Sequence, residues 1–376
     1  MKKGTYPLHD EANFNYQLNR TIMWGGGDLE DIKTIAPLIK TTEDWVREMT
    51  ALAEGAEAHG RITCAIGYYR MAEFFEADGS PDKIMLYRKS KSLFYEHYRD
   101  LFIKTIRREE ITYENGKLPV WICLPETEVK DTVIIHGGND SYMEEFLPVV
   151  QRLLSEGIAV YLFDGPGQGG ALRESGIYYT YQWEKPVKAI LDAYELEDVT
   201  LIGLSLGGML APRAAAFESR IKRVVAWGIM PNFYDVVLSK VPKELRLLMD
   251  QEEKEQVNAL IQKKMEADPL VKWAIQHGMF SMNVETPYDY LNRTRDFEME
   301  SIGHQITQDF LLMGSSEDHF IPVTLYKRVI DALPHVKSLT YTLYTKSDAA
   351  ENHCNMGNTA LVVDDIIHWI VWAKNK

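Results

Sequence analysis

The chain has 376 residues, of which 45% are hydrophobic and 26% are charged, and its formal net charge is −14 at pH 7. This composition is typical of an ordinary globular protein with a sizeable buried core. The negative charge argues against nucleic acid or an anionic membrane surface as a partner, because both would repel the protein.

The amino terminus and the cysteines indicate the compartment. The first residues precede no apolar run, and no stretch of about 18 uncharged apolar residues occurs, so neither a secretory signal nor a membrane span is expected. Cys64, Cys123 and Cys354 are odd in number and far apart, which argues against disulfides and against a cysteine metal site. We therefore expect a cytoplasmic protein that needs no metal or cofactor.

Helical sequence fills most of the first hundred residues, after a loop-like stretch around Trp24. Residues 41–56 place apolar side chains on one helix face, and Thr41 or Thr42 can cap that helix. Further helices are expected over residues 61–77 and on to about residue 102. Because no self-similar repeat is present, we predict a helical cap domain over residues 1–103 rather than a helical-repeat scaffold.

Beyond residue 104, short apolar strands alternate with helices, as in a mostly parallel sheet covered on both faces. Strands are expected at residues 105–110, 118–124, 132–135, 159–163, 199–202, 224–227, 310–313 and 339–344. Helices are expected at residues 144–156, 209–217 and 359–373. The pattern predicts an α/β domain over residues 104–376 with about eight strands.

Charged helical sequence interrupts this domain at residues 231–308, a segment longer than a simple crossover requires. It includes a helical stretch at residues 243–265. We interpret the segment as a helical insertion over the active site; the alternative is a surface helix pair without substrate contact.

A serine lies between glycines in the motif Gly203-Leu204-Ser205-Leu206-Gly207. The spacing alone is weak evidence, but the motif follows an apolar strand and precedes a helix, so Ser205 falls on the sharp turn of a nucleophile elbow. The glycines allow the close approach that this turn needs. We predict that Ser205 is a nucleophile and that the Leu206 amide, at the start of the helix, binds an oxyanion.

The loop after the strand at residues 132–135 can supply a second oxyanion donor. Its sequence is His136-Gly137-Gly138-Asn139, and the candidate amides are those of Gly138 and Asn139. We interpret His136 as a buttress of this loop rather than a catalytic group.

A glycine-rich stretch at residues 163–169 resembles a phosphate loop at first sight. It lacks the Lys-Ser/Thr ending of a Walker motif and precedes no clear helix, so nucleotide binding is not expected. We predict a tight loop at the carboxyl edge of the sheet, where ligands of such folds bind.

An activating histidine and its carboxylate should follow the serine in the chain, in the order acid and then histidine. Asp318 follows a buried strand and is the predicted acid, with Glu317 as its neighbour and competitor. His353 lies in the polar loop before the last helix and is the predicted base. His319 and His335 fall outside that loop.

Cys354 and three aromatic residues each allow two interpretations. Cys354 adjoins His353, but without an elbow around it a small buried residue is favoured over a thiol nucleophile. Trp183, Tyr178 and Tyr179 follow the fourth strand and are candidates to line an aromatic substrate pocket, or they belong to the core.

These motifs together resemble the α/β-hydrolases with an N-terminal helical cap. That group includes 2,6-dihydroxypseudooxynicotine hydrolase, the fungal pigment polyketide-shortening hydrolases and the fermentation-respiration switch proteins. The stretches that match are residues 136–141 with Glu144 and Glu145, and residues 163–169, 203–208, 317–322 and 351–358.

The resemblance implies an α/β-hydrolase fold, a triad of Ser205, Asp318 and His353, and, in the first two branches, hydrolysis of a carbon–carbon bond beside a carbonyl. It also implies an acidic catalytic residue in the loop after the third strand. Asp140 is the nearest match, although Glu144 lies close by and helix capping is an alternative role for Asp140.

We therefore expect a serine hydrolase acting on a small ketone, with an aromatic ketone as one candidate, and by resemblance a homodimer. The alternatives are a carboxylesterase for small esters and a non-catalytic regulatory or binding protein built on a hydrolase frame.

Overall fold

The computed structural model describes residues 3–376 of the chain. Contacts between residues divide the chain into two units. The sheet unit comprises the residues up to Gly4, Ile103–Ser239 and Arg293–Lys376, and the helical unit comprises Thr5–Phe102 and Lys240–Asn292.

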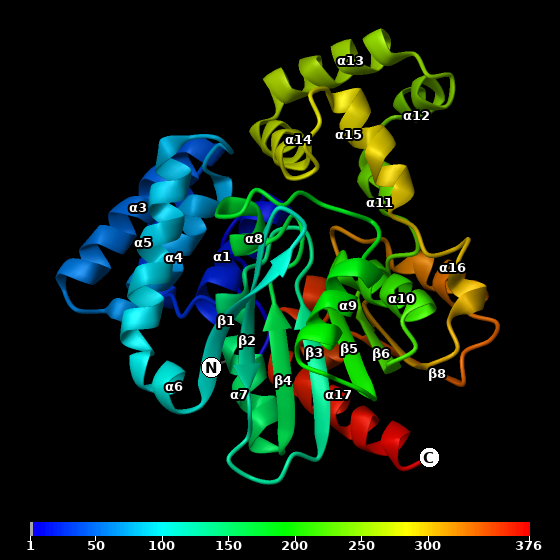
Figure 1. Cartoon of the computed structure of the whole chain (residues 1–376). Helices are drawn as coiled ribbons and strands as arrows, with labels where there is room; N and C mark the ends of the chain where they lie inside the picture. Colours follow the sequence, from blue (N-terminus) through cyan, green and yellow to red (C-terminus); the bar gives the residue numbers. More distant parts are fainter. Residues whose placement is uncertain (1–2) are drawn as a thin grey trace. The chain divides into compact units, whose positions relative to one another are not determined.

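The sheet unit contains one sheet of eight strands in the order β1-β2-β4-β3-β5-β6-β7-β8 (Figure 1). The pairs β1–β2 and β2–β4 are antiparallel, and all other pairs are parallel. The strands are β1 Ile106–Tyr113, β2 Gly116–Cys123, β3 Asp131–His136, β4 Ile158–Phe163, β5 Val199–Leu204, β6 Ile221–Trp227, β7 Asp309–Ser315 and β8 Ser338–Tyr344. The prediction of a mostly parallel α/β sheet is confirmed.

Helices cover both faces of this sheet. α7 packs against α17 on one face, and α9 packs against α10 on the other (Figure 1). The α-helices of the unit are α7 Leu147–Ser155, α8 Gly169–Arg173, α9 Glu184–Ala193, α10 Gly207–Phe217, α11 Phe233–Val237, α16 Tyr326–Asp331 and α17 Thr359–Lys374. The short α8 follows the glycine-rich stretch at residues 163–169, for which the sequence predicted no clear helix.

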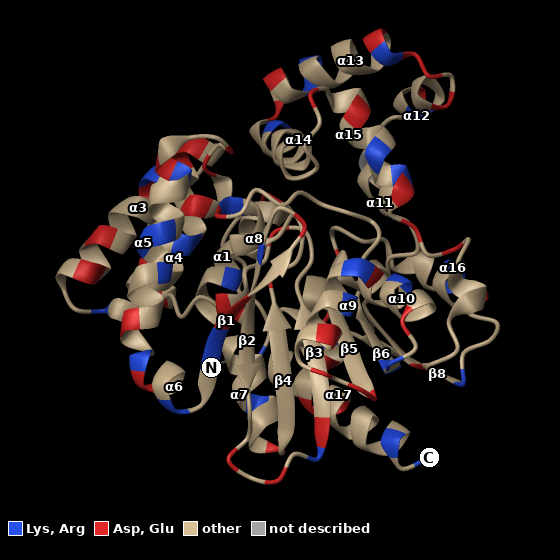
Figure 2. Cartoon of the chain, in the orientation of Figure 1, with Lys and Arg blue, Asp and Glu red and all other residues tan. Residues whose placement is uncertain are grey.

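The inner strands are apolar because both of their faces are covered. β5 is buried along its whole length, and β3, β6 and β7 carry their charged residues near their amino ends. Figure 2 shows the same contrast between pale inner strands and charged helix surfaces. This leaves the carboxyl ends of the strands as the edge from which the loops with the predicted site residues emerge.

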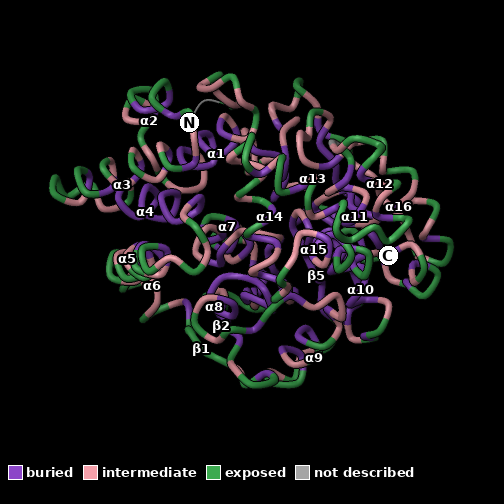
Figure 3. The backbone as a smooth tube through the Cα atoms, turned by 90° about the horizontal axis from the view of Figure 1, so that it is seen from above, coloured by how far each residue is buried: buried purple, intermediate pink, exposed green. Residues whose placement is uncertain are grey.

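The helical unit is made of two separate stretches of the chain. Its helices, including two that reach its borders, are α1 Ala12–Met23, α2 Leu29–Ile35, α3 Thr42–Ala58, α4 Ile62–Phe75, α5 Pro81–His97, α6 Arg99–Lys104, α12 Lys243–Asp250, α13 Lys254–Ala267, α14 Pro269–Ser281 and α15 Pro287–Arg293. α4 packs against α3 and α5 and is buried over most of its length (Figure 3). Thr41 caps α3 in a capping box with Asp44.

The sequence placed residues 1–103 alone in a cap domain and left the insertion in the α/β domain. In the structure, the insertion segment Lys240–Asn292 forms one unit with the N-terminal helices. The Trp273 indole donates to the Phe74 carbonyl at 2.9 Å, and His277 Nδ1 lies 2.9 Å from Asp78 Oδ2. The reason is that α14 completes the apolar core of the N-terminal helices, a contact between segments about 200 residues apart.

Two helix boundaries also differ from the sequence prediction. α1 precedes Trp24, where a loop was expected, because its buried face carries polar side chains such as Gln17 and Asn19 that hide the apolar period. The helix expected over residues 243–265 is two helices, α12 and α13, separated near Glu252, which has a positive φ of 57°. Among residues 3–376, no helix has the length and apolar character to cross a membrane.

Candidate active site

Ser205 occupies a sharp turn between β5 and α10. Its backbone is in the left-handed region with a φ of 58°, and its amide donates to the Trp227 carbonyl at 2.9 Å. A Cβ on Gly203 would lie 2.1 Å from the Gly207 carbonyl oxygen, so the turn requires glycine there. The strained turn therefore holds the serine at the carboxyl end of the central strand.

His353 connects the serine to a carboxylate. Its Nε2 lies 2.9 Å from Ser205 Oγ, and its Nδ1 lies 2.7 Å from Asp318 Oδ2. The other carboxylate oxygen of Asp318 accepts from the amides of Phe320 and Ile321, each at 2.9 Å. The structure thus brings together the three residues that the sequence selected from separate loops.

Burial and charge act in opposite directions on the two titratable members of this chain of hydrogen bonds. Burial alone would raise the pKa of Asp318, but the charge and hydrogen bond of His353 and the two backbone amides outweigh burial and lower that pKa. Burial likewise opposes a charged His353, yet the negative charge of Asp318 holds the pKa of His353 well above its ordinary value. The pair therefore favours carboxylate and imidazolium.

The two predicted oxyanion loops lie side by side. Leu206 is the N-cap residue of α10, and a Cβ on Gly138 would lie 3.0 Å from the Leu206 nitrogen and 2.7 Å from Ser205 Cβ. The Gly138 amide donates to Ser141 Oγ at 3.2 Å, a long hydrogen bond, and Asn139 is half-buried in the same loop. The loop after β3 thus reaches the serine turn, as the sequence predicted.

His136 packs against the glycines of the serine turn, in a position to support the loop after β3. It is completely buried against Phe163 and Trp183, and its Nδ1 lies 3.0 Å from the Gly137 carbonyl oxygen. Its Nε2 has no hydrogen-bond partner among the described residues. Burial lowers the pKa of His136 to about 4, so the ring is neutral at physiological pH.

The aromatic residues after β4 do not form an open pocket wall. Trp183 is completely buried, and Tyr179 is buried with its hydroxyl donating to the Gly138 carbonyl. Of the three aromatic candidates, Tyr178 alone is exposed, at 39%. Of the two alternatives left open for Trp183 and Tyr179, burial supports core packing and loop anchoring over substrate contact.

The acidic candidates after β3 lie in the loop and the short helix that follow this strand. Asp140 is half-buried in the loop, two residues before Tyr142, which is the N-cap residue of the next helix. At the start of this helix, Glu145 Oε1 accepts from the Tyr142 amide. Glu144 lies in the same short 3₁₀ helix, η2 Met143–Phe146. The catalytic and the capping role of Asp140 both stay predictions.

Asn355 is a buried residue of the histidine loop that the sequence interpretation missed. Its Oδ1 accepts from the Trp227 indole at 2.8 Å, and its Nδ2 donates to Ser315 Oγ and the Ala350 carbonyl. It therefore ties the loop to β6 and β7. The available signal was a small polar residue two positions after the histidine; like Cys354, Asn355 has a positive φ.

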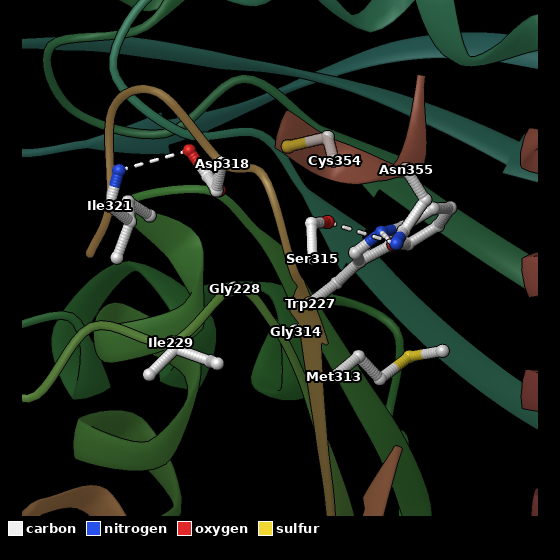
Figure 4. Close-up of a pocket in the computed structure, with 10 residues that line it drawn as sticks. All are labelled: Trp227, Gly228, Ile229, Met313, Gly314, Ser315, Asp318, Ile321, Cys354 and Asn355. Atoms are coloured by element: carbon white, nitrogen blue, oxygen red, sulfur yellow. Dashed lines mark hydrogen bonds between the residues drawn. The ribbon is translucent and has the colours of Figure 1, made fainter. Parts of the chain in front are cut away.

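A small cavity lies behind the acid, between Asp318 and Asn355 (Figure 4). Its volume of about 10 Å³ is close to the minimum for one water. Cys354 also lines this cavity and is buried. The space is too small for an organic substrate and belongs to the packing of the acid and histidine loops.

Comparison with known proteins identifies the fold family. The family model described as alpha/beta hydrolase fold matches residues 133–348, more than half of the chain. The chain belongs to the α/β-hydrolase fold family. This α/β-hydrolase is 27% identical to Hydrolase acrC of Aspergillus aculeatus over 83% of its own length and 84% of the relative.

Two further relatives connect this α/β-hydrolase with named hydrolases. The 20-hydroxy-prefusarin hydrolase FUS2 of Gibberella moniliformis is 27% identical and covers 74% of this chain and 75% of its own. The 2,6-dihydropseudooxynicotine hydrolase of Paenarthrobacter nicotinovorans is 31% identical over 40% of each chain.

Solved structures show the same fold. The crystal structure of the 2,6-dihydroxy-pseudo-oxynicotine hydrolase superimposes with a TM-score of 0.68 at 19% identity, covering 94% of this α/β-hydrolase and 95% of that chain. At this identity the likeness concerns the fold. It extends over nearly the whole of both chains, including the N-terminal helices.

Proposed function

We propose that this α/β-hydrolase is a serine hydrolase with Ser205 as nucleophile, His353 as general base and acid, and Asp318 as the orienting carboxylate. The observation that carries the proposal is the unbroken hydrogen-bonded path from Ser205 Oγ through both ring nitrogens of His353 to Asp318. A strained serine turn at the head of a helix adds to it. A merely structural glycine turn would need none of these partners.

The first half of the reaction follows from this path. His353 accepts the hydroxyl proton as Ser205 Oγ attacks a carbonyl carbon, and Asp318 stabilises the imidazolium that forms. The amides of Leu206 and Gly138 receive the oxyanion, an interaction worth roughly 3–4 kcal/mol per donor in comparable sites. The Gly138 amide exchanges its long bond to Ser141 Oγ for the oxyanion.

We further propose that the bond cleaved is a carbon–carbon bond beside a carbonyl in a small ketone. Collapse of the tetrahedral adduct breaks that bond, and the leaving carbanion, stabilised as an enolate by a second carbonyl, takes its proton from His353. Water, deprotonated by His353, then releases the acid from Ser205. This choice rests on the sequence resemblance to the hydrolases that cleave such bonds.

The nucleophile is tested with a fluorophosphonate probe. The wild-type protein is expected to become labelled at Ser205, and the Ser205→Ala variant is expected to lose the label, because the hydroxyl that lies 2.9 Å from His353 Nε2 is then absent. Ser219→Ala, an exposed serine of the same unit, is the matched control and should label normally. Equal labelling of wild type and Ser205→Ala would refute the proposal.

The bond class is tested by turnover of two substrate sets. Aryl β-diketones should be hydrolysed with a higher kcat/KM than p-nitrophenyl esters of matched size. A preference for the esters would instead support a carboxylesterase that uses the same triad. Binding of ligands with no turnover and no labelling would support a non-catalytic protein on a hydrolase frame.

A further inference from the structure

Gln168 is a buried polar residue of the glycine-rich stretch between β4 and α8 to which the proposed function assigns no role. It is 2% exposed, and both the oxygen and the nitrogen of its side-chain amide form hydrogen bonds. Oε1 accepts from the Gly165 amide at 3.0 Å, while Nε2 donates to the carbonyl oxygens of Gly137 and Gly138, each at 2.9 Å. Gln168 therefore joins its own loop to the loop after β3.

Tyr179 holds the same segment from a second position. Its hydroxyl donates to the Gly138 carbonyl, so this oxygen receives hydrogen bonds from both Tyr179 and Gln168. The ring lies directly on Gly167, where a Cβ would come within 2.1 Å of Tyr179 Cδ2. With the phenol 3% exposed, water does not compete for these bonds.

Peptide geometry links these carbonyls to the oxyanion donors. In a planar trans peptide, the carbonyl of one residue and the amide of the next point in opposite directions. Fixing the Gly137 carbonyl therefore fixes the direction of the Gly138 amide, and fixing the Gly138 carbonyl does the same for Asn139. Because Gly138 packs on the serine turn, small rotations of these two peptides would misdirect the donors at Ser205.

We propose that Gln168 and Tyr179 are positioning residues that lock the two peptide planes after β3, so that the oxyanion donors are preorganised toward Ser205. The proposal deepens the serine-hydrolase function and rests on it. Glutamine suits the task because one amide supplies an acceptor for its own loop and donors for both carbonyls. A glutamate at this position would place a carboxylate oxygen, which only accepts hydrogen bonds, against the carbonyl oxygens of Gly137 and Gly138.

Kinetics of Gln168→Met and Tyr179→Phe provide the test, with Gln182→Met and Tyr194→Phe as matched controls in the same unit. Both test variants should lower kcat, Gln168→Met by about 10–100-fold and Tyr179→Phe less, with KM within about twofold, because oxyanion contacts form only in the transition state. Gln168→Glu should be at least as impaired as Gln168→Met. The controls should keep wild-type kcat.

A second readout separates positioning from a general structural defect. Affinity for an arylboronic acid, whose tetrahedral adduct with Ser205 places an oxygen in the oxyanion site, should fall in parallel with kcat. The acid limb of the kcat/KM pH profile, which reports His353, should stay in place. Thermal unfolding shows whether each variant is folded under the assay conditions, and Tyr179→Phe keeps the ring packing if Gln168→Met does not fold.

Two outcomes distinguish this proposal from the function on which it rests. Wild-type labelling by the fluorophosphonate with unchanged kcat and boronate affinity in folded variants would overturn the positioning role alone. Absence of wild-type labelling would overturn the serine-hydrolase function and the positioning role with it.

Discussion

At the scale of single residues, the triad pairs two groups whose charges stabilise each other. Asp318 lowers the free energy of protonated His353, and His353 does the same for the carboxylate. The raised pKa of His353 matters for the proposed catalysis, because only the neutral ring can accept the proton of Ser205. Chain order and the position of each loop after its strand predicted these residues, but they could not give this shift.

The first prediction concerns pH. kcat/KM should rise with pH as His353 loses its proton, and the midpoint should lie above about 6.5, the ordinary pKa of histidine. Asp318→Asn should move this midpoint to lower pH and reduce kcat on the order of 10⁴-fold. Glu317→Gln, the neighbouring exposed carboxylate, is the control and should change neither quantity. A midpoint unaffected by Asp318→Asn would argue against the pair.

The second prediction concerns stability and His136. Its pKa is about 4 in the folded protein and about 6.5 when unfolded. Between these values the unfolded chain binds the proton, so stability is lost as the pH falls from about 6.5 to about 4. Relative to His136→Gln, wild type should lose up to about 3 kcal/mol across this window in denaturant titrations. The surface variant His59→Gln should keep the wild-type slope; an identical slope in His136→Gln would contradict the buried neutral ring.

At the scale of elements, the junction of β5 and α10 depends on backbone approaches that side chains would block. Gly203 faces the Gly207 carbonyl, and Gly208 faces the Gly228 carbonyl, where a Cβ would lie 2.4 Å away. The sequence motif predicted the turn because the glycines around the serine can be read from the order of residues along the chain. The pairing of Gly208 with Gly228 was not predictable, since it depends on how β5 and β6 lie side by side.

The third prediction compares two glycine substitutions. Gly203→Ala should abolish activity and destabilise the protein by several kcal/mol, because the contact is with backbone that cannot move aside. Gly55→Ala, in α3 with nothing within 4 Å of the new methyl group, should stabilise by about 0.5–1 kcal/mol. Thermal unfolding and turnover measure both effects. A well-folded, active Gly203→Ala protein would refute the steric account of the turn.

At the scale of the whole molecule, the helical unit is assembled from two segments that, in the sequence, flank the stretch containing β1 to β6. Trp273 of α14 stacks on Phe74 of α4, with ring centroids 4.9 Å apart, and His277 reaches Asp78. The insertion therefore completes a core that the N-terminal helices begin.

The fourth prediction tests this shared core. Trp273→Ala should destabilise the helical unit by about 2 kcal/mol, below the range for fully buried tryptophans because Trp273 is half-buried. Hydrogen exchange should become faster in α4 as well as in α14, while β5 and β6 keep their protection. Trp372→Ala, on the exposed side of α17 at 47% exposure, is the control. Unchanged exchange in α4 would show that the two segments fold separately.

The sequence by itself determined the α/β sheet, the strand-turn-helix at Ser205 and the order of acid and histidine, because apolar periodicity, glycine spacing and chain order are local properties. Only the tertiary structure decided that α14 joins the N-terminal helices and that Trp183 lies in the core. It also decided that Tyr179 and Gln168 donate hydrogen bonds to the loop after β3. These outcomes depend on which surfaces and polar atoms meet after folding. In the folded protein, residues far apart in the chain pack against and hydrogen-bond to one another, and no local sequence pattern identifies such partners.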